Sequence, residues 1–204
     1  MLRSVTGVVL AAGAAERMGE PKLLLPFGGS TVLNTTLASV EASEVDRVVV
    51  VSGANADSIE ASIVGDRASV VHNPNYRSGN MSSFVAGATA DPEASAYILV
   101  PGDLPTIRTG VINEMVELWD ESGPWAAVTA YVDAVAHPFL VSRDALELAM
   151  RTPGDKVLGR LLIESDDDRV VRLESPFAAP RDINTPEEYD ALLEAAARTS
   201  LEDE

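Results

Sequence analysis

The chain of 204 residues contains no cysteine and only two lysines, and aromatic residues make up 5% of it. The absence of cysteine excludes disulfides, thiolate metal sites and a cysteine nucleophile. Because aromatic residues are few, alanine, valine and leucine must supply most of the core, and a hydrophobic content of 46% is enough to bury one. We therefore expect one domain over residues 1–198, followed by an acidic tail over residues 199–204.

Long hydrophobic runs and an excess of positive charge are also absent. No apolar run is much longer than a strand, so the sequence predicts neither a signal peptide nor a membrane span, and we expect a cytoplasmic protein. The formal net charge is -17, whereas a surface that binds the nucleic-acid backbone needs clustered cations. We therefore expect no nucleic-acid partner. A small anionic ligand is compatible with this charge, because a phosphate site needs only local positive charge and oriented N–H groups.

Short apolar runs alternate with segments of helical spacing along the chain. This alternation is typical of a mainly parallel sheet that is covered by helices on both faces. The sequence thus predicts a single-domain α/β fold, in which ligands bind beyond the carboxyl ends of the strands. Strands are expected at Val5–Leu10, Arg47–Ser52, Ala68–His72, Ala96–Val100, Ala126–Tyr131, Phe139–Ser142 and Arg169–Leu173. Helices are expected at Thr31–Ala42, Asp57–Val64, Met81–Ala90, Thr109–Glu121, Asp144–Arg151, Lys156–Glu164 and Pro186–Arg198.

The loop after the first strand carries glycines and cations. Gly13 follows the strand directly, and Arg17, Gly19 and Lys22 come behind it. Glycine lets the backbone approach a ligand, and successive N–H groups can form an anion-binding concavity. Arg17 can bond phosphate oxygens, and Lys22 supplies a compact point charge. An ordinary strand-to-helix turn with an exposed arginine and lysine is the alternative.

The same loop resembles the signature of nucleotidyltransferases with a Rossmann-like fold of the nucleotide-diphospho-sugar transferase type, and the resemblance extends from Gly7 to Leu193. It implies that an NTP binds to Leu10, Ala11, Ala12 and Gly13 together with Arg17 and Lys22, and that Arg17, Lys22 and Asp103 are catalytic. The residues that carry the signature are Leu10, Ala11, Ala12, Gly13, Arg17, Met18, Gly19, Lys22 and Leu24.

Two acidic residues complete the predicted site. Asp103 ends the fourth expected strand, and Asp182 precedes Thr185 and Pro186, which are expected to start the last helix. Mg²⁺ binds through one or two carboxylates plus substrate phosphates, so we expect Asp103 to hold Mg²⁺, with Asp182 as a second ligand. The alternatives are a turn or helix-cap aspartate at position 103 and a buried, hydrogen-bonded aspartate at position 182.

The segment Asn73–Ser83 resembles the part of the molybdenum cofactor cytidylyltransferase family that contacts the base and the ribose. The resemblance implies that Gly79, Ser82 and Ser83 bind the nucleotide, and helix capping is the alternative for the two serines. Met81 stands where that family has a second glycine. The resemblance therefore favours CTP and leaves GTP open.

His137 and Lys156 resemble the acceptor-side residues of the same family, although Ala136 stands where the family often has glycine. The resemblance implies that both contact a phosphorylated acceptor such as molybdopterin, whose phosphate attacks the α-phosphorus of the NTP and releases pyrophosphate. A structural turn histidine before Pro138 and a lysine on a helix surface are the alternatives. An anionic phosphate acceptor needs no strong base, so positioning and electrostatics suffice.

Other functions fit the same sequence. A guanylyltransferase or an NTP-sugar synthase would use the same first loop. A non-catalytic partner of a molybdoenzyme or of a maturation factor would keep the fold without turnover. An oxidoreductase is disfavoured, because the first loop lacks the dinucleotide fingerprint Gly-x-Gly-x-x-Gly; it does not match a P-loop either. The presence of both Lys22 and Asp103 favours a magnesium-dependent nucleotidyltransferase.

Overall fold

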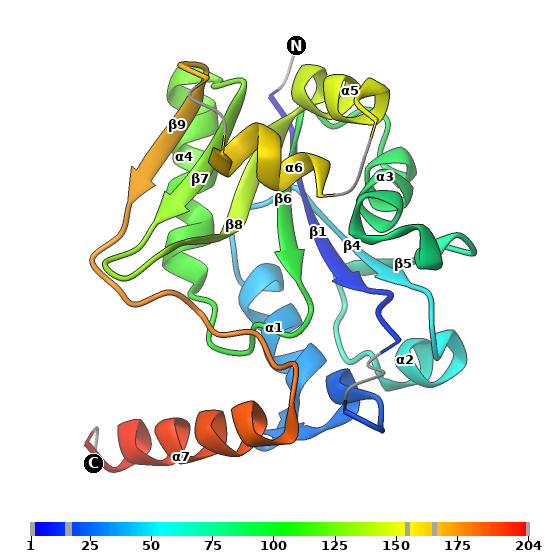
Figure 1. The fold of residues 1–204 in the computed structure, drawn as a ribbon, viewed down its shortest axis with the longest axis vertical. Coiled ribbons are helices and arrows are strands. Elements are labelled where there is room, and N and C mark those ends of the chain that lie inside the picture. Colours follow the sequence, from blue (N-terminus) through cyan, green and yellow to red (C-terminus); the bar gives the residue numbers. More distant parts are fainter. Residues whose placement is uncertain (1–2, 15–17, 154–155, 165–166, 203–204) are drawn as a thin grey trace.

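A seven-stranded sheet runs through the computed structural model, which describes residues 3–14, 18–153, 156–164 and 167–202 (Figure 1). Neighbouring strands are parallel except at β8, which is antiparallel to both strands beside it. The predicted mainly parallel α/β sheet is thus confirmed. In spatial order the strands are β5 (Ala68–His72), β4 (Arg47–Ser52), β1 (Val5–Ala11), β6 (Ala96–Pro101), β8 (Val135–Ser142), β7 (Ala126–Ala130) and β9 (Val170–Glu174).

Helices cover both faces of the sheet, because alternate residues of each buried strand point to opposite faces. On β1, Val9 belongs to one hydrophobic core and Val8 to the other. The first core includes side chains of α1 (Val32–Glu41), α2 (Ala56–Ser62), α4 (Thr109–Ser122) and α7 (Pro186–Glu202). The second includes side chains of α3 (Asn80–Ala90), α5 (Arg143–Arg151), α6 (Val157–Gly159) and the π-helical turn η3 (Arg160–Glu164).

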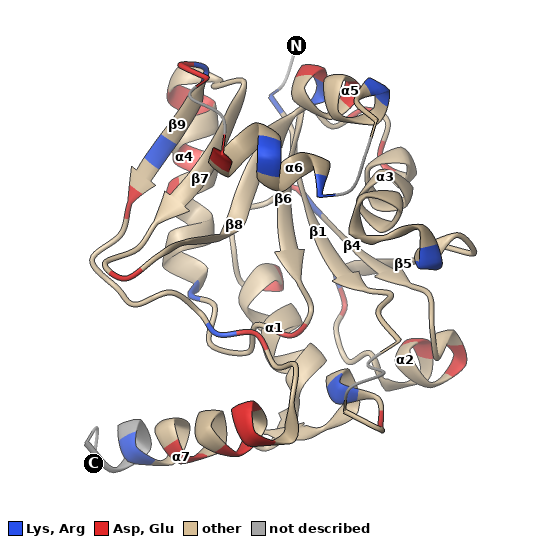
Figure 2. Cartoon of the chain, in the orientation of Figure 1, with Lys and Arg blue, Asp and Glu red and all other residues tan. Residues whose placement is uncertain are grey.

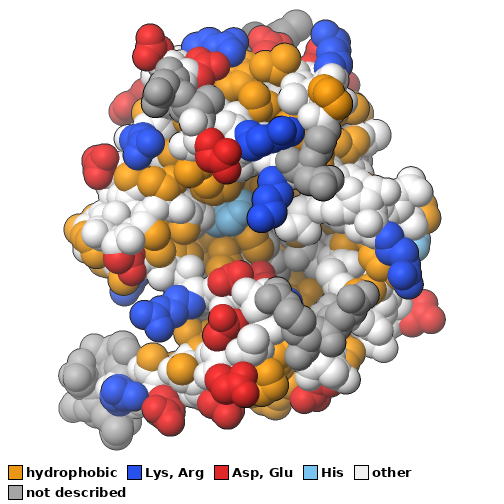
Figure 3. Space-filling model, in the orientation of Figure 1, with side chains coloured by type: hydrophobic (Ala, Val, Ile, Leu, Met, Phe, Trp, Pro, Cys, Tyr) orange, Lys and Arg blue, Asp and Glu red, His pale blue; other side chains and the backbone are white. Residues whose placement is uncertain are grey.

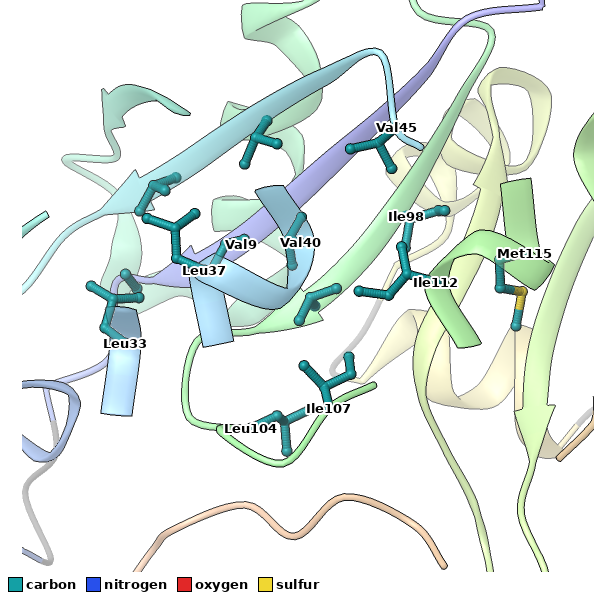
Figure 4. Packing of buried hydrophobic residues seen from close by; sticks show 14 of the residues in the cluster. Val9, Leu33, Leu37, Val40, Val45, Ile98, Leu104, Ile107, Ile112 and Met115 are labelled. Atoms are coloured by element: carbon teal, nitrogen blue, oxygen red, sulfur yellow. The ribbon is translucent and has the colours of Figure 1, made fainter. Parts of the chain in front are cut away.

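The first core is built from apolar residues at helical spacing on α1 and α4. Leu33, Leu37 and Val40 of α1 and Ile112 and Met115 of α4 are all completely buried. Figure 4 shows these side chains gathered against β1, β4 and β6. Each such side chain stabilises the fold by about 1.5–3 kcal/mol relative to an exposed position. This packing fixes the carboxyl ends of the central strands, where the predicted site residues lie.

The start of β8 differs from the sequence prediction, which began the strand at Phe139. Pro138 suggested a break, because proline cannot donate to a sheet ladder. In the structure Val128 pairs with Phe139, whereas the next residue, Thr129, pairs with Ala136. The register therefore shifts at this point and Pro138 falls in the irregularity, where no ladder hydrogen bond is required of it.

Short elements line the carboxyl edge of the sheet. A 3-10 turn, η1 (Lys22–Leu24), leads into the small hairpin of β2 (Pro26–Phe27) and β3 (Ser30–Thr31). A second 3-10 turn, η2 (Tyr76–Ser78), lies in the loop after β5. Because the parallel strands all end at this edge, the loops that follow β1, β4, β5 and β6 come together there.

The last helix is longer than expected. It continues to Glu202, into the stretch that the sequence analysis sets apart as an acidic tail. Within the described ranges, no helix combines the length and the apolar character needed to cross a bilayer.

Candidate active site at the carboxyl edge of the sheet

Lys22 and Asp103 are in direct contact. The Nζ of Lys22 lies 2.5 Å from Oδ2 of Asp103, and the two side chains are 16% and 13% exposed. Lys22 belongs to the η1 turn, and Asp103 follows the end of β6. A charge-assisted hydrogen bond between partly buried groups is stronger than an exposed surface ion pair. The contact therefore fixes the end of the first loop to the middle of the sheet.

The ammonium of Lys22 also reaches the segment before α7. Nζ donates to the carbonyl oxygen of Ile183 at 2.5 Å and lies 3.4 Å from Oδ1 of Asn184. An ammonium has three hydrogens, so these two groups and Asp103 use its full donor capacity. Lys22 thus connects three segments that are far apart in the sequence.

Asp182 belongs to the same polar network. Its Oδ2 accepts a hydrogen bond of 2.7 Å from Nδ2 of Asn184, the residue that lies beside Lys22. The side chain of Asp182 is exposed, so it is not the buried aspartate of the alternative interpretation. The fold therefore brings the two predicted acidic residues into one chain of contacts that runs from Asp103 through Lys22 and Asn184 to Asp182.

The start of α7 holds this network in place. The backbone N–H groups of Asn184 and Thr185 donate to Oε2 of Glu188 at 2.7 and 3.1 Å. In return, Oγ1 of Thr185 accepts from the backbone N–H of Glu188 at 3.3 Å. This is a capping box, and it confirms the predicted cap at Thr185 with Pro186 as the first helical residue.

The network offers oxygen donors suited to a divalent cation. Asp103 and Asp182 supply carboxylates, and Asn184 supplies an amide oxygen between them. Mg²⁺ takes one or two carboxylates and completes its coordination with substrate phosphates and water. No group of three or more histidine, aspartate or glutamate side chains in the described part of the chain is placed to hold an ion alone. The donor set therefore fits an ion that binds together with a phosphate ligand.

The first loop is held at its base by two backbone hydrogen bonds. The carbonyl oxygen of Leu10 accepts from the N–H of Gly102 at 2.9 Å, and that of Ala12 accepts from the N–H of Ala54 at 3.1 Å. Ala11 and Ala12 are buried, whereas Gly13 is exposed. The loop therefore leaves the sheet from a fixed base. The predicted ligand Arg17 lies outside the described residues.

Gly13 is not required by the packing of the protein. Among the residues that the structure describes, none lies within 4 Å of a Cβ atom placed on it, and its φ lies outside the left-handed region. By contrast, a Cβ on Gly102 would lie 2.8 Å from the carbonyl oxygen of Leu10. The glycine at position 102 is explained by this close approach, whereas none of the described residues requires a glycine at position 13.

The two serines at the start of α3 hold the preceding loop. Nδ2 of Asn73 donates to the hydroxyl oxygens of Ser82 and Ser83, each at 3.0 Å. The hydroxyl of Ser82 donates to the carbonyl oxygen of Gly79 at 2.8 Å. Gly79 precedes the helix with a φ of 93°, and no side chain caps the helix. The serines therefore do not cap α3, as the alternative interpretation expected; they shape the loop that contains Gly79.

His137 lies in β8 and is fixed by several contacts. Its Nδ1 is 3.2 Å from the carbonyl oxygen of Leu99, and its ring stacks on Phe139 with 3.9 Å between centroids. Burial lowers the pKa of His137 to about 4, against the opposing effects of the Leu99 carbonyl and the charge of Asp182. The ring is therefore neutral at physiological pH. Figure 3 shows a hollow in the centre of this face, with a histidine and apolar side chains at its bottom.

Lys156 lies apart from the Asp103 network. It is exposed and precedes α6 with a φ of 52°, and its neighbours Gly154 and Asp155 lie outside the described residues. Figure 2 shows basic residues at α6, and a basic residue beside an acidic one in the segment before α7. Among the contacts of the described residues, none joins Lys156 to Lys22, Asp103, Asn184 or Asp182.

Two contributors to the site were not singled out from the sequence. Asn184 bridges Lys22 and Asp182, and the signal for it was its place within the predicted Asp-Ile-Asn-Thr-Pro segment. Phe139 supports His137, and the spacing of two residues along a strand would have indicated a shared face. That signal was lost because the predicted strand began only after Pro138.

Comparison with known proteins assigns the chain to a family. Residues 7–170 match the MobA-like NTP transferase domain. The molybdenum cofactor cytidylyltransferase of Escherichia coli K12 is 24% identical over 189 residues, which cover 92% of this chain and 95% of that protein. Nicotine blue oxidoreductase of Paenarthrobacter nicotinovorans is 33% identical over 116 residues, which cover 56% of this chain and 57% of that protein.

Solved structures agree with this assignment. Rv0371c of Mycobacterium tuberculosis H37Rv is 30% identical, with a TM-score of 0.85 over 95% of this chain and 100% of that one. Its complex with manganese gives a TM-score of 0.77 at 31% identity, over 94% of this chain and 98% of that one. The family match includes the first loop, Asp103 and His137, whereas Asp182 lies beyond it. The chain therefore belongs to the MobA-like NTP transferase domain family and is a nucleotidyltransferase.

Proposed function

We propose that the protein transfers a nucleotidyl group from an NTP, with CTP favoured, to a phosphorylated acceptor such as molybdopterin, in a Mg²⁺-dependent reaction. The observation that carries this proposal is the network of Asp103, Lys22, Asn184 and Asp182 at the end of the first loop. It combines a cation with two carboxylates at the edge where α/β sheets bind ligands.

The first loop is the proposed triphosphate site. None of the described residues crowds the backbone of Gly13, and backbone N–H groups in such a loop can bind phosphate oxygens. Arg17 and Lys22 contribute positive charge in a chain whose net charge is -17. Lys22 has a second task in this scheme, because it also positions Asp103.

Asp103 and Asp182 are the proposed ligands of Mg²⁺. When bound, the ion neutralises charge on the phosphate oxygens. The manganese complex of the mycobacterial relative supports a divalent cation in this fold. The acceptor phosphate would then form a bond to the α-phosphorus, while the bond from that phosphorus to the bridging oxygen breaks and pyrophosphate leaves with the electron pair. The chain's own contribution is to hold both groups in line and to stabilise charge.

The loop from Asn73 to Ser83 is the proposed site of the base and ribose. Its shape is fixed by the hydrogen bonds between Asn73 and the two serines, which leave Gly79 exposed. Part of Met81 packs against the second core, so some of its volume is turned away from this loop. We therefore keep CTP as the favoured nucleotide and GTP as its alternative.

Thermal unfolding with each NTP tests this proposal, since a ligand that binds only the folded state raises the melting temperature. With Mg²⁺ present, we expect CTP to give the largest increase, and Lys22→Ala to abolish it. The matched control is Arg198→Ala, which removes one positive charge from an exposed ion pair on α7. A larger increase with GTP would favour a guanylyltransferase, whereas no increase with any NTP would contradict nucleotide binding.

A further inference from the structure

The start of α7 is joined to the first loop by two separate contacts. Nζ of Lys22 donates to the carbonyl oxygen of Ile183 at 2.5 Å, and the hydroxyl of Tyr189 donates to the carbonyl oxygen of Pro26 at 2.6 Å. Figure 1 shows the start of α7 beside the segment that follows β1. The two contacts close a ring, whose loop side is the chain from Lys22 to Pro26 and whose helix side is the chain from Ile183 to Tyr189.

The loop side of this ring is constrained by its own backbone. The N–H of Leu25 donates to the carbonyl oxygen of Lys22 at 3.3 Å, and the carbonyl oxygen of Leu25 accepts from the N–H of Val32 at 2.9 Å. The side chain of Leu23 is buried in the first core. Since each residue has only two soft backbone torsions and these are largely fixed here, a displacement of Pro26 is passed on to Lys22.

The helix side of the ring is held by the capping box and by apolar packing. The carboxylate of Glu188 accepts from the backbone N–H groups of Asn184 and Thr185, which fixes the chain just before α7. Ile183 is completely buried, and the ring of Tyr189 packs against the first core. The hydroxyl of Tyr189 therefore projects from a fixed support.

The hydroxyl of Tyr189 acts as the donor in its contact with the loop. The carbonyl oxygen of Pro26 can only accept, so the hydrogen bond between them has one possible direction. Burial, together with the negative charges of Asp190 and Glu20, raises the pKa of Tyr189, so the hydroxyl stays protonated. The hydrogen bond to Pro26 is therefore kept throughout the physiological pH range.

We propose that Tyr189 is a positioning residue for the transfer site: its hydroxyl holds Pro26 against α7 and thereby keeps the ammonium of Lys22 on the carboxylate of Asp103. This inference rests on the proposed function, which assigns Lys22 to the triphosphate. Tyr189 acts through Lys22 and touches no substrate atom. Without the hydroxyl the ring of contacts is open at one point, and Lys22 can leave the geometry that the phosphates require. Catalysis by positioning is sensitive to such small displacements.

Nitrogen-15 NMR of the lysine side chains tests this positioning without any substrate. The chain has only two lysines, so label at Nζ gives two signals, and Lys156→Arg identifies that of Lys22. We expect Tyr189→Phe, which keeps the ring and removes only the hydroxyl, to shift the Lys22 signal and not that of Lys156. The matched control is Tyr97→Phe, because the hydroxyl of Tyr97 also donates to a backbone carbonyl, that of Asp91, at 3.3 Å. An unchanged Lys22 signal in Tyr189→Phe, or the same shift in Tyr97→Phe, would overturn the proposal.

Kinetics of the same variants separate positioning from a general loss of stability. We expect Tyr189→Phe to lower kcat/KM for the NTP by about 3–10-fold, the range of one lost hydrogen bond, whereas Tyr97→Phe leaves it unchanged. In a Lys22→Ala background, Tyr189→Phe should cause no further loss of the residual activity, because it acts through the lysine. An unchanged kcat/KM in Tyr189→Phe, or the same loss with and without Lys22, would contradict the proposal. If no NTP is used, the proposed function fails while the NMR result stands.

Discussion

The Nζ of Lys22 lies 2.5 Å from the Asp103 carboxylate and, at the same time, 2.5 Å from the carbonyl oxygen of Ile183. One ammonium therefore ties the first loop and the end of β6 to the segment that carries Asp182. We infer that the lysine both positions the proposed metal ligands and adds positive charge to the proposed triphosphate site.

Replacing Lys22 by alanine leaves the partly buried carboxylate of Asp103 without this partner. We expect pyrophosphate release to fall by at least about 10²-fold, because a cation at the phosphates is lost. We also expect the free energy of unfolding to fall by about 1–3 kcal/mol, measured by urea denaturation. Near-normal turnover in the alanine variant would contradict the assignment of Lys22.

The double variant Lys22→Ala/Asp103→Ala separates the two tasks of the lysine. Removing both partners takes away the unpaired charge, so we expect it to regain part of the stability that Lys22→Ala loses. Pyrophosphate release should stay abolished, since the double variant also lacks the proposed metal ligand. Recovery of turnover together with stability would show that Lys22 has only a structural role.

Asp182→Asn tests the second metal ligand. The change keeps the size of the side chain and removes its charge, so we expect the Mg²⁺ concentration for half-maximal activity to rise roughly tenfold or more. Activity at saturating Mg²⁺ should recover in large part. Asp190→Asn, which removes an exposed carboxylate from α7, is the matched control. The same Mg²⁺ dependence in wild type and Asp182→Asn would exclude Asp182 as a ligand.

Alanine substitutions at Gly13 and Gly102 should affect different properties, nucleotide binding in the first case and stability in the second. At Gly13 the added Cβ would meet none of the described residues within 4 Å, so we expect Gly13→Ala to keep its melting temperature but to weaken CTP binding. At Gly102 the added Cβ would lie 2.8 Å from a backbone oxygen, and we expect a loss of about 1–3 kcal/mol of stability. Titration calorimetry measures the affinity for CTP, and urea denaturation measures the stability. Unchanged CTP affinity in Gly13→Ala would argue against phosphate binding at this loop.

The low pKa of His137 makes stability depend on pH in a defined direction. The pKa of His137 is about 4 in the folded protein, whereas an unperturbed histidine, as in the unfolded chain, has a pKa of 6.5. As the pH falls, the unfolded chain therefore binds the proton first. The stabilisation by the neutral ring is complete above pH 6.5 and declines as pH falls from 6.5 towards 4. When the pH is lowered from 7 to 5, we expect the free energy of unfolding of the wild type to fall by about 1–2 kcal/mol more than that of His137→Gln. Urea denaturation at several pH values measures this difference. The same pH dependence of the free energy of unfolding in both proteins would contradict the burial of a neutral imidazole.

The central strands could be predicted from the sequence because burial on both faces leaves a distinct pattern. The apolar run of β4, which is buried from Val48 to Ser52, predicted the observed bounds Arg47–Ser52. The observed bounds of β5, Ala68–His72, were also predicted, although β5 is an edge strand with no buried residue. The beginning of β8 could not be predicted in the same way. Pro138 interrupts its pattern, and only the pairing with β7 shows that the register shifts around the proline.

For the site, the sequence indicated which residues to consider but not how they meet. Lys22 and Asp103 could be proposed separately from their loops, whereas their contact spans 81 positions of the chain and arises only when β1 and β6 lie side by side. The link through Asn184 depends on hydrogen-bond geometry, for which a linear sequence gives no signal. The contact of the His137 ring likewise involves a backbone carbonyl on another strand, that of Leu99.

Release of pyrophosphate tests the proposed reaction most directly. The protein is incubated with Mg²⁺, molybdopterin and one NTP at a time, and pyrophosphate is measured with and without a chelator. We expect release with CTP that is lost with the chelator and in Asp103→Asn. No pyrophosphate with any NTP, or undiminished release in Asp103→Asn, would contradict a nucleotidyl transfer centred on Lys22 and Asp103.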